Sequence, residues 1–277
     1  MLVKFKYFVV KFLEKIPQVQ FIIYNNLKYF KFLLPHDKDY LGLNLLFKKN
    51  EKGAFLDIGG NIGLSTLGFR YLGFVDNEIL IFEPDQYLIE KYLDKIKTKD
   101  NKVKIFPFGL SNKNEVKFLY KASYKNLRIH VNNSFDKNYI QEKIKNNYPN
   151  KYKYFKFSKK KYRLKIFDNI KYKEKISFIK IDVEGYDHLV LEGMRQFLKK
   201  NTPVFLVEYN NSNFIKIWNK LKSKYNCYRF DFDNKCFKKI PKVIIMNLEK
   251  SYIFDKKYNK NSINFFLIPK KFRFKQK

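Results

Sequence analysis

The chain has 277 residues, 45% of them hydrophobic and 19% aromatic, so it can build a sizeable core in one large α/β domain or two small ones. This composition excludes a wholly disordered chain, and with ten Gly and two Cys the chain is neither collagen-like nor held together by disulfides. The formal net charge of +32 suggests acidic partners only weakly, because nearly all of the 58 basic residues are Lys and accompany abundant Asn, Phe and Tyr, as an AT-rich gene would encode them.

Residues 1–50 predict a helical, aromatic-rich N-terminal arm that ends near Pro35. Its longest uncharged stretch, 16–27, is shorter than the roughly 20 apolar residues that cross a bilayer, and lysines interrupt the apolar run that a signal peptide needs. We therefore expect a cytoplasmic protein without a transmembrane segment, which the low number of cysteines also favours. The arm is expected to pack on the main domain, although a basic, aromatic segment can also contact a membrane surface peripherally.

Residues 51–277 predict one domain in which strands and helices alternate. Its first half is expected to contain a strand at 54–58, a glycine turn, a helix at 64–72, a strand at 79–82, a helix at 85–97 and a strand at 103–108. Leu64, Leu67 and Tyr71 are expected to share the apolar face of the first helix, and Pro107 favours a place at the sheet edge for the third strand. Such alternation implies parallel β-α-β units with right-handed crossovers.

The second half of the domain follows a segment of little periodicity. Residues from about 121 to 165 are interpreted as an irregular, exposed insertion or lid, because 146–161 are dense in Lys, Tyr and Asn and show little periodicity. After it the pattern predicts a strand at 177–181, a helix at 187–200, a strand at 203–207, a helix at 214–224, a hairpin-like pair at 228–232 and 236–237, and a last strand at 264–268.

A glycine-rich turn is the first candidate site. The turn after the strand at 54–58 contains Asp57, Gly59, Gly60, Asn61 and Gly63. Glycine lets the backbone approach a ligand closely and adopt positive φ, and Asn is the other residue that best tolerates that geometry. Glu83 closes the next strand 20 residues after Gly63, the spacing at which a carboxylate binds ribose hydroxyls in a nucleotide-binding βαβ unit. Together these features predict a site for a nucleoside cofactor.

The acid in this turn helps to select the cofactor. The strict G-x-G-x-x-G pattern is absent, and Asp57 would repel a pyrophosphate at the start of the helix. A carboxylate there suits a cationic or amine-bearing ligand such as S-adenosylmethionine (SAM).

Three carboxylates at strand ends are the second candidate site. Asp182 follows the strand at 177–181, Glu184 lies two residues later, and Glu208 ends the next strand. This edge is where open α/β sheets bind ligands, and in an extended chain Asp182 and Glu184 would face the same side. As bases that take a proton from an acceptor we rank Asp182 first, Glu184 second and Glu208 third. Such a trio can bind a metal, but with no His among the three we expect none.

Two histidines are the other bases near neutral pH. His36 follows a proline in the N-terminal arm, from where it could reach over the cleft, and His188 lies early on a helix. A structural or solvated role is the more common one for a lone histidine.

In this order the motifs resemble the FkbM-type SAM-dependent methyltransferases. The resemblance covers about residues 53–210, with a plausible closing strand at 264–268, and its most specific part is K-I-D-V-E-G at 180–185 followed by V-L-E-G at 190–193. Gly60 and Phe167 stand where the family usually has Ala and Leu, and the insertion at 121–165 has no counterpart that we can place.

The resemblance implies a Rossmann-like class I methyltransferase fold, α/β, with a seven-stranded, mostly parallel sheet and helices on both faces. It implies SAM as the cofactor and methyl transfer to a hydroxyl, often on a sugar or a natural product. It also implies contacts of the cofactor's methionine end with Asp57, Gly59, Asn61 and Gly63, of its ribose with Glu83, of its adenine with Ser111 or Asn112, and of its sulfonium with Asp182.

An O-methyltransferase that acts on a small-molecule or glycan hydroxyl is therefore the leading hypothesis. A nucleic-acid methyltransferase is the alternative, because the charge and the aromatic residues suit nucleic acid. Base methyltransferases of this fold typically have an Asn/Asp-Pro-Pro-aromatic segment where this chain has D-V-E-G at 182–185, so nucleic acid is not the expected partner. This segment does not exclude methylation of ribose, and salt-sensitive binding to RNA would separate the two hypotheses. A SAM-binding module without catalysis is the third hypothesis, which the intact acids oppose.

Overall fold

The computed structural model describes residues 16, 18–19, 22, 34–50, 52–129, 133–208, 211–241, 245 and 264–274. Most of the expected N-terminal arm, residues 1–33, lies outside the described residues. Among the residues that are described, no helix is long and apolar enough to cross a membrane.

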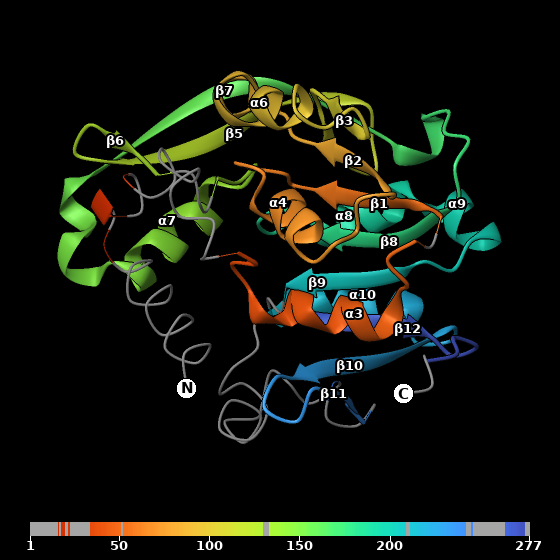
Figure 1. Ribbon diagram of the computed structural model, residues 1–277. Helices are drawn as coiled ribbons and strands as arrows, with labels where there is room; N and C mark the ends of the chain where they lie inside the picture. The colour runs from red at the N-terminus through yellow and green to blue at the C-terminus, as the bar shows by residue number, and fades with distance from the viewer. Residues whose placement is uncertain are drawn as a thin grey trace.

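The domain is built on an eight-stranded sheet with the order β11-β10-β12-β9-β8-β1-β2-β3 (Figure 1). Its strands are β1 (Ala54–Ile58), β2 (Glu78–Phe82), β3 (Val103–Phe106), β8 (Ile176–Ile181), β9 (Val204–Glu208), β10 (Tyr225–Asp231), β11 (Cys236–Lys239) and β12 (Asn264–Pro269). The five strands from β9 to β3 are parallel, and β12 runs antiparallel to both of its neighbours. This arrangement confirms the Rossmann-like α/β fold. It has one strand more than expected, because the predicted hairpin adds β11 to the edge.

Helices cover both faces of this sheet. They are α3 (Leu43–Leu46), α4 (Leu64–Tyr71), α5 (Gln86–Leu88), α6 (Asp94–Lys97), α8 (Asp187–Gly193), α9 (Arg195–Lys200) and α10 (Asn211–Leu221). Alternate residues of β1 enter opposite cores: Leu56 packs in the core that contains α8 and α10, and Phe55 packs in the core that contains α3 and α4. Burial on both faces explains the continuous apolar runs by which the strands were predicted.

Three helix predictions need correction. The helix expected at 85–97 consists of α5, a π-helical turn at Ile89–Leu93 and α6, and the helix expected at 187–200 is divided at Met194 into α8 and α9. The apolar face expected for α4 was wrong, because the side of Tyr71 is exposed and Phe69 is fully buried instead. The Phe69 ring lies 5.6 Å from the rings of Phe55 and Phe178, so the sheet decides which face of α4 turns inward.

The segment expected to be irregular contains most of a second sheet. This sheet has the order β4-β7-β5-β6, with β4 at Gly109–Leu110, β5 at Glu115–Tyr124, β6 at Leu127–Arg128 and β7 at Phe155–Lys165. Between β6 and β7 lie α7 (Lys137–Asn147) and a 3-10 helix at Pro149–Tyr154. Ile140 and Ile144 of α7 are fully buried among residues of β5 and β7. The expectation failed because the exposed positions of β7 are mostly lysines, as in a solvated segment, and because β5 and β7 pair across the residues 125–154 that separate them.

Residues 34–50 belong to the main core, although we expected them to be part of an arm. A 3-10 helix at Lys38–Gly42 leads into α3, and Tyr40, Leu43, Leu46 and Phe47 are all buried. The rings of Phe47 and Phe55 lie 5.4 Å apart, and the ring of Tyr40 lies 5.5 Å from that of Phe69. The described end of the arm thus covers the sheet face on which α4 lies.

Candidate functional site

A pocket opens at the carboxyl ends of β1, β2 and β8. It contains about 750 Å³ of empty space, including open solvent at its mouth. The second sheet and the segment before α7 close its other side. The lining residues include Gly59, Asn61, Glu83, Leu88, Leu110, Leu119, Asn133, Phe135, Asp182 and Glu184. Its mixture of apolar walls and a few polar groups is typical of a site for a small ligand.

The glycine turn forms one wall of this pocket. Gly59 has φ +82°, and a Cβ atom there would lie 1.9 Å from the carbonyl oxygen of Asp182, so only glycine lets β1 and β8 end side by side. Asn61 also has positive φ and lines the pocket. Gly60 and Gly63 pack behind the turn, where an added Cβ would meet Ile81 and Ile96. Of the predicted turn residues, Gly59 and Asn61 therefore face the pocket directly.

Glu83 is held at the floor of the pocket by backbone amides. Its Oε2 accepts a hydrogen bond from the Asn61 amide at 2.8 Å, and its Oε1 accepts one from the Asp85 amide at 2.9 Å. Burial raises the pKa of Glu83 to about 7, although these two hydrogen bonds act in the opposite direction. Each oxygen retains a lone pair, so the carboxylate is oriented and can still accept hydroxyl hydrogen bonds from a ligand.

Asp57 lies behind the pocket and acts through Lys180, which the sequence analysis did not assign to the site. Asp57 is fully buried, its Oδ2 accepts a hydrogen bond from Thr66, and its Oδ1 lies 3.4 Å from the Lys180 ammonium. The same ammonium lies 3.3 Å from Asp182 Oδ2 and donates to the carbonyl of Gly59 at 2.9 Å. A lysine inside the apolar strand Ile176–Ile181 was the signal that could have identified this residue, because a buried ammonium requires partners.

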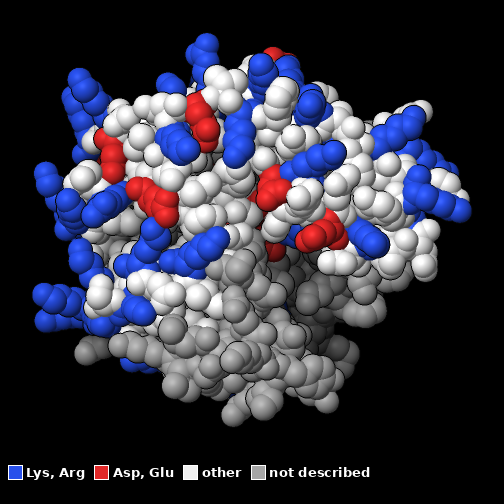
Figure 2. All heavy atoms as spheres, turned by 180° about the vertical axis from the view of Figure 1, so that it is seen from behind, with Lys and Arg blue, Asp and Glu red and all other residues white. Residues whose placement is uncertain are grey.

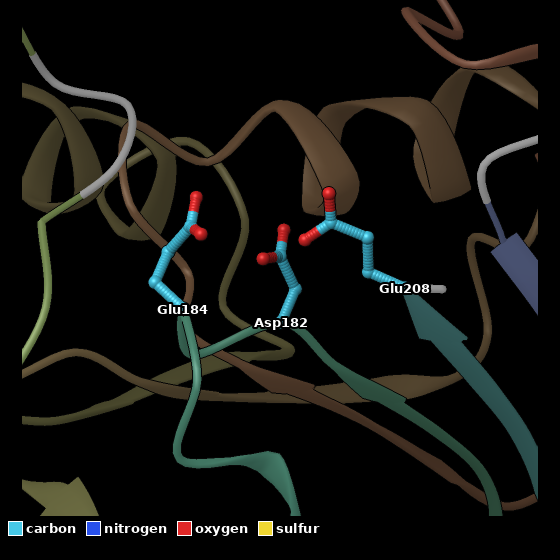
Figure 3. A group of neighbouring side chains, drawn as sticks. All are labelled: Asp182, Glu184 and Glu208. Atoms are coloured by element: carbon cyan, nitrogen blue, oxygen red, sulfur yellow. The ribbon is translucent and has the colours of Figure 1, made fainter. Parts of the chain in front are cut away.

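The three predicted acids converge, as Figure 3 shows. Oxygen atoms of Asp182, Glu184 and Glu208 all lie within 4.8 Å of one another. The reason given for this convergence was partly wrong: Glu184 lies in a turn with φ +50°, not in an extended strand. Burial raises the pKa of Glu208 well above its ordinary value. Burial also acts to raise the pKa of Asp182, but Lys180 and Lys143 outweigh it and hold that pKa below its ordinary value.

Two residues of α7 reach this acidic cluster and were not found from the sequence. Lys143 pairs with Glu184 Oε2 and lies 3.6 Å from Glu208 Oε1. Tyr139, one helical turn earlier, donates a hydrogen bond to Glu184 Oε2 at 3.1 Å. Nothing in the sequence distinguishes Lys143 from the many other lysines, because only the fold brings α7 to the ends of β8 and β9.

The second sheet is also tied to the pocket through Asp85, two residues after Glu83. Asp85 is fully buried, lies 2.9 Å from the Lys121 ammonium and accepts a hydrogen bond from Tyr162 at 3.0 Å. Arg128 is a third partner of the same carboxylate. Lys121, Arg128 and Tyr162 were not predicted from the sequence, and they fix the turn that presents the Asp85 amide to Glu83.

The remaining predicted site residues lie apart from the pocket lining. Ser111 is fully buried, its carbonyl lies against Gly193, and Asn112 donates a hydrogen bond to Glu192 at 2.8 Å. Both therefore contact α8, while Gly109 and Leu110 just before them line the pocket. Their contact with an adenine remains a prediction.

The histidines are placed differently from each other. Burial and Lys180 lower the pKa of His36 to about 4, so its ring is neutral at pH 7 and lies 5.3 Å from that of Tyr40. His188 is half-buried on α8, and burial lowers its pKa too.

This arrangement combines an oriented carboxylate, a closely approached backbone turn and a strand-end acid in one pocket. A family model described as the methyltransferase FkbM domain matches residues 57–231, more than half of the chain. Among solved structures the chain is similar to the methyltransferase FkbM from Methylobacillus flagellatus KT, with 14% identity, a TM-score of 0.45 and coverage of 70% of this chain and 48% of that one. The chain thus spans about half the length of that protein.

A second similar structure is the precorrin-6y C5,15-methyltransferase from Geobacter metallireducens GS-15, with 9% identity, a TM-score of 0.36 and coverage of 83% of this chain and 84% of that one. No curated protein matches the chain. The family match includes both the glycine turn and the strand-end acids, and the chain belongs to the FkbM methyltransferase family.

Proposed function

We propose that the chain transfers the methyl group of SAM to a hydroxyl group, on a sugar or a glycan precursor. The observation that carries this proposal is that Glu83 and Asp182 line the same pocket, one suited to ribose hydroxyls and the other to an acceptor hydroxyl. The choice of a sugar comes from the resemblance to the family, because no single residue identifies the acceptor.

The residues of the pocket fit a nucleoside cofactor. Glu83 is oriented by two amides, as a carboxylate that accepts two ribose hydroxyl hydrogen bonds needs to be. Asn133 lines the pocket, and its buried Oδ1 accepts no hydrogen bond from the residues that the structure describes. A buried amide oxygen of this kind suits a ligand N–H or O–H. Leu88, Leu110 and Phe135 add apolar walls on which a flat base can pack.

When bound, SAM would supply an electrophilic methyl group on a positively charged sulfur. The protein then has to align the acceptor oxygen with that methyl group, exclude water and receive the hydroxyl proton. Asp182 is the base that we propose, because it lines the pocket and its side chain is 40% exposed. Lys180 keeps this carboxylate ionised, and its negative charge also favours a cationic sulfur nearby. Glu184 lines the pocket, Glu208 lies beside it, and both pair with Lys143; in this proposal they orient the acceptor and do not take its proton.

Calorimetry with SAM tests the cofactor proposal. Wild type is expected to bind SAM, and Glu83→Ala is expected to lose about 1.5–3 kcal/mol of binding free energy, as for hydrogen bonds to a charged group. Glu90→Ala is the matched control, because Glu90 is exposed on the following helical turn and accepts a hydrogen bond from the side chain of Gln86. A folded wild-type chain without SAM binding would refute the cofactor assignment.

A methyl-transfer assay with labelled SAM then tests the acceptor. Glycans and RNA are offered as acceptors to wild type and to Asp182→Asn. We expect wild type to methylate glycan hydroxyls and Asp182→Asn to lack this activity. On the described part of the face seen in Figure 2, acidic residues lie among the Lys and Arg side chains. Transfer to RNA alone would replace the glycan proposal with its nucleic-acid alternative.

A further inference from the structure

Lys143 lies inside the acidic cluster formed by Asp182, Glu184 and Glu208. Its ammonium pairs with Glu184, lies 3.6 Å from Glu208 Oε1 and is 3.4 Å from the hydroxyl of Tyr139. The ammonium donates hydrogen bonds to Glu184 and to the Tyr139 hydroxyl, and its contact with Glu208 is an ion pair. The oxygens come from the turn after β8, from the end of β9 and from α7.

The cluster also has the dimensions of a divalent metal site. Its carboxylate oxygens lie within 4.8 Å of one another. Oxygens that share one Mg²⁺, Mn²⁺ or Ca²⁺ ion are bound at about 2.0–2.6 Å and are therefore at most about 5 Å apart. Three carboxylates this close repel one another strongly, and either a proton on one of them or a cation among them relieves this repulsion. Either a metal ion or a basic side chain can supply that cation.

The fold delivers Lys143 to this position on a firmly held helix. Ile140 and Ile144, on either side of Lys143, are fully buried in the core of the second sheet. Ser134 Oγ, just before α7, donates a hydrogen bond to the carbonyl of Glu184 at 2.7 Å. At Gly185, φ is +96° and an added Cβ would lie 3.2 Å from the Tyr139 ring, so glycine lets α7 approach the turn closely. The lysine is thus part of the packed structure of the rim.

We propose that Lys143 is a built-in cation that takes the place of a divalent metal ion between Glu184 and Glu208. The insertion that contains α7 then supplies the positive charge that balances Glu184 and Glu208 beside the pocket. Wild-type chain binds no metal at the cluster, and replacement of Lys143 by a neutral residue creates a metal site. The catalytic consequence rests on the proposed function: methyl transfer by wild type requires no added metal.

Titration with Mn²⁺ tests the proposal without any need for activity. The metal-free, full-length chain is titrated with Mn²⁺ in a calorimeter. In parallel, electron paramagnetic resonance measures the concentration of free Mn²⁺. The variants are Lys143→Met, which keeps the length of the side chain, Lys143→Arg, which keeps its charge, and Lys145→Met, which removes an exposed lysine from the same helix. Far-UV circular dichroism and thermal melts establish that each variant is folded.

We expect wild type, Lys143→Arg and Lys145→Met to show no binding at the cluster. Lys143→Met is expected to bind one Mn²⁺ per chain at least about tenfold more tightly than wild type, and the further change Glu208→Gln is expected to abolish this gain. The proposal would be overturned if wild type bound one Mn²⁺ per chain and Glu208→Gln removed this binding. A folded Lys143→Met chain that gains no Mn²⁺ binding would overturn it as well.

The activity assay separates this proposal from the proposed function. If wild type transfers methyl groups, excess EDTA is expected to leave its rate within about twofold, and Mn²⁺ is expected to restore part of the rate that Lys143→Met loses. If no variant shows activity, the proposed function fails while the Mn²⁺ titration still decides the role of Lys143.

Discussion

Replacement of Lys180 by Met should destabilise the fold strongly, whatever ligand the pocket binds. Lys180 is only 6% exposed, and its ammonium lies 3.4 Å from Asp57, which is fully buried. Removal of the ammonium leaves Asp57 with the hydrogen bond from Thr66 and without its ion pair. Loss of one partner of a buried pair costs about 3–5 kcal/mol, because the remaining charge is buried without compensation.

The magnitude is large compared with the total stability of a domain, which is about 5–15 kcal/mol. It corresponds to a decrease in Tm on the order of 10 °C for a domain of this size. Urea unfolding can be followed by the fluorescence of Trp218, which is 1% exposed and the single tryptophan of the chain. Lys175→Met is the control, since Lys175 is exposed just before the same strand.

The pH dependence gives a second test of the same reasoning. Burial raises the pKa of Asp57 above the ordinary value of 3.8 in the folded chain, and loss of Lys180 raises it further. A carboxyl whose pKa is raised by folding does not reduce the folding stability while it is protonated in both the folded and the unfolded state. Its destabilising effect grows as the pH rises above the pKa of the unfolded state. The deficit of Lys180→Met should therefore be smaller at pH 4.5 than at pH 7.5. The double variant with Asp57→Asn should recover much of the loss. If Lys180→Met loses less than about 1 kcal/mol of unfolding free energy at pH 7.5, Lys180 contributes no more than a surface ion pair, and its proposed role as the partner of a buried charge is refuted.

Two further predictions concern the pocket and its rim. Burial raises the pKa of Glu83 from 4.5 to about 7, so wild type should lose stability as the pH rises from about 4.5 through 7. Glu83→Gln should lose less over the same range, because its remaining loss comes from other buried carboxyls such as Asp57 and Glu208. Parallel urea midpoints for the two chains between pH 5 and pH 7.5 would contradict this. Gly185→Ala should destabilise the chain more than Gly73→Ala and should increase amide hydrogen exchange in α7. Both positions have positive φ, but the new methyl at Gly185 would lie 3.2 Å from the Tyr139 ring, while at Gly73 the nearest atom is 3.5 Å away. Equal losses of stability in the two variants would show that backbone strain alone accounts for the effect.

The sequence by itself determined the order of strands and helices in the main domain and the residues at the strand ends. Each strand is a short apolar run bounded by a turn, and because both of its faces are buried, the run stands out in the sequence. Gly59, Glu83 and Asp182 were identifiable because they follow such runs directly, and parallel strands bring their carboxyl ends to one edge. Local pattern and spacing were sufficient at these positions.

Tertiary structure alone decided what surrounds these residues. Lys143 meets Glu184 across 41 positions, and Lys121 meets Asp85 across 36, so no local pattern links them. The second sheet depends on the pairing of β5 with β7, and its exposed lysines resemble those of any solvated segment in a chain so rich in Lys. Which lysine is buried beside an acid, and which face of α4 turns inward, follow from packing against elements distant in sequence. The chemistry at the strand ends was therefore visible in the sequence, and the charges that control it were not.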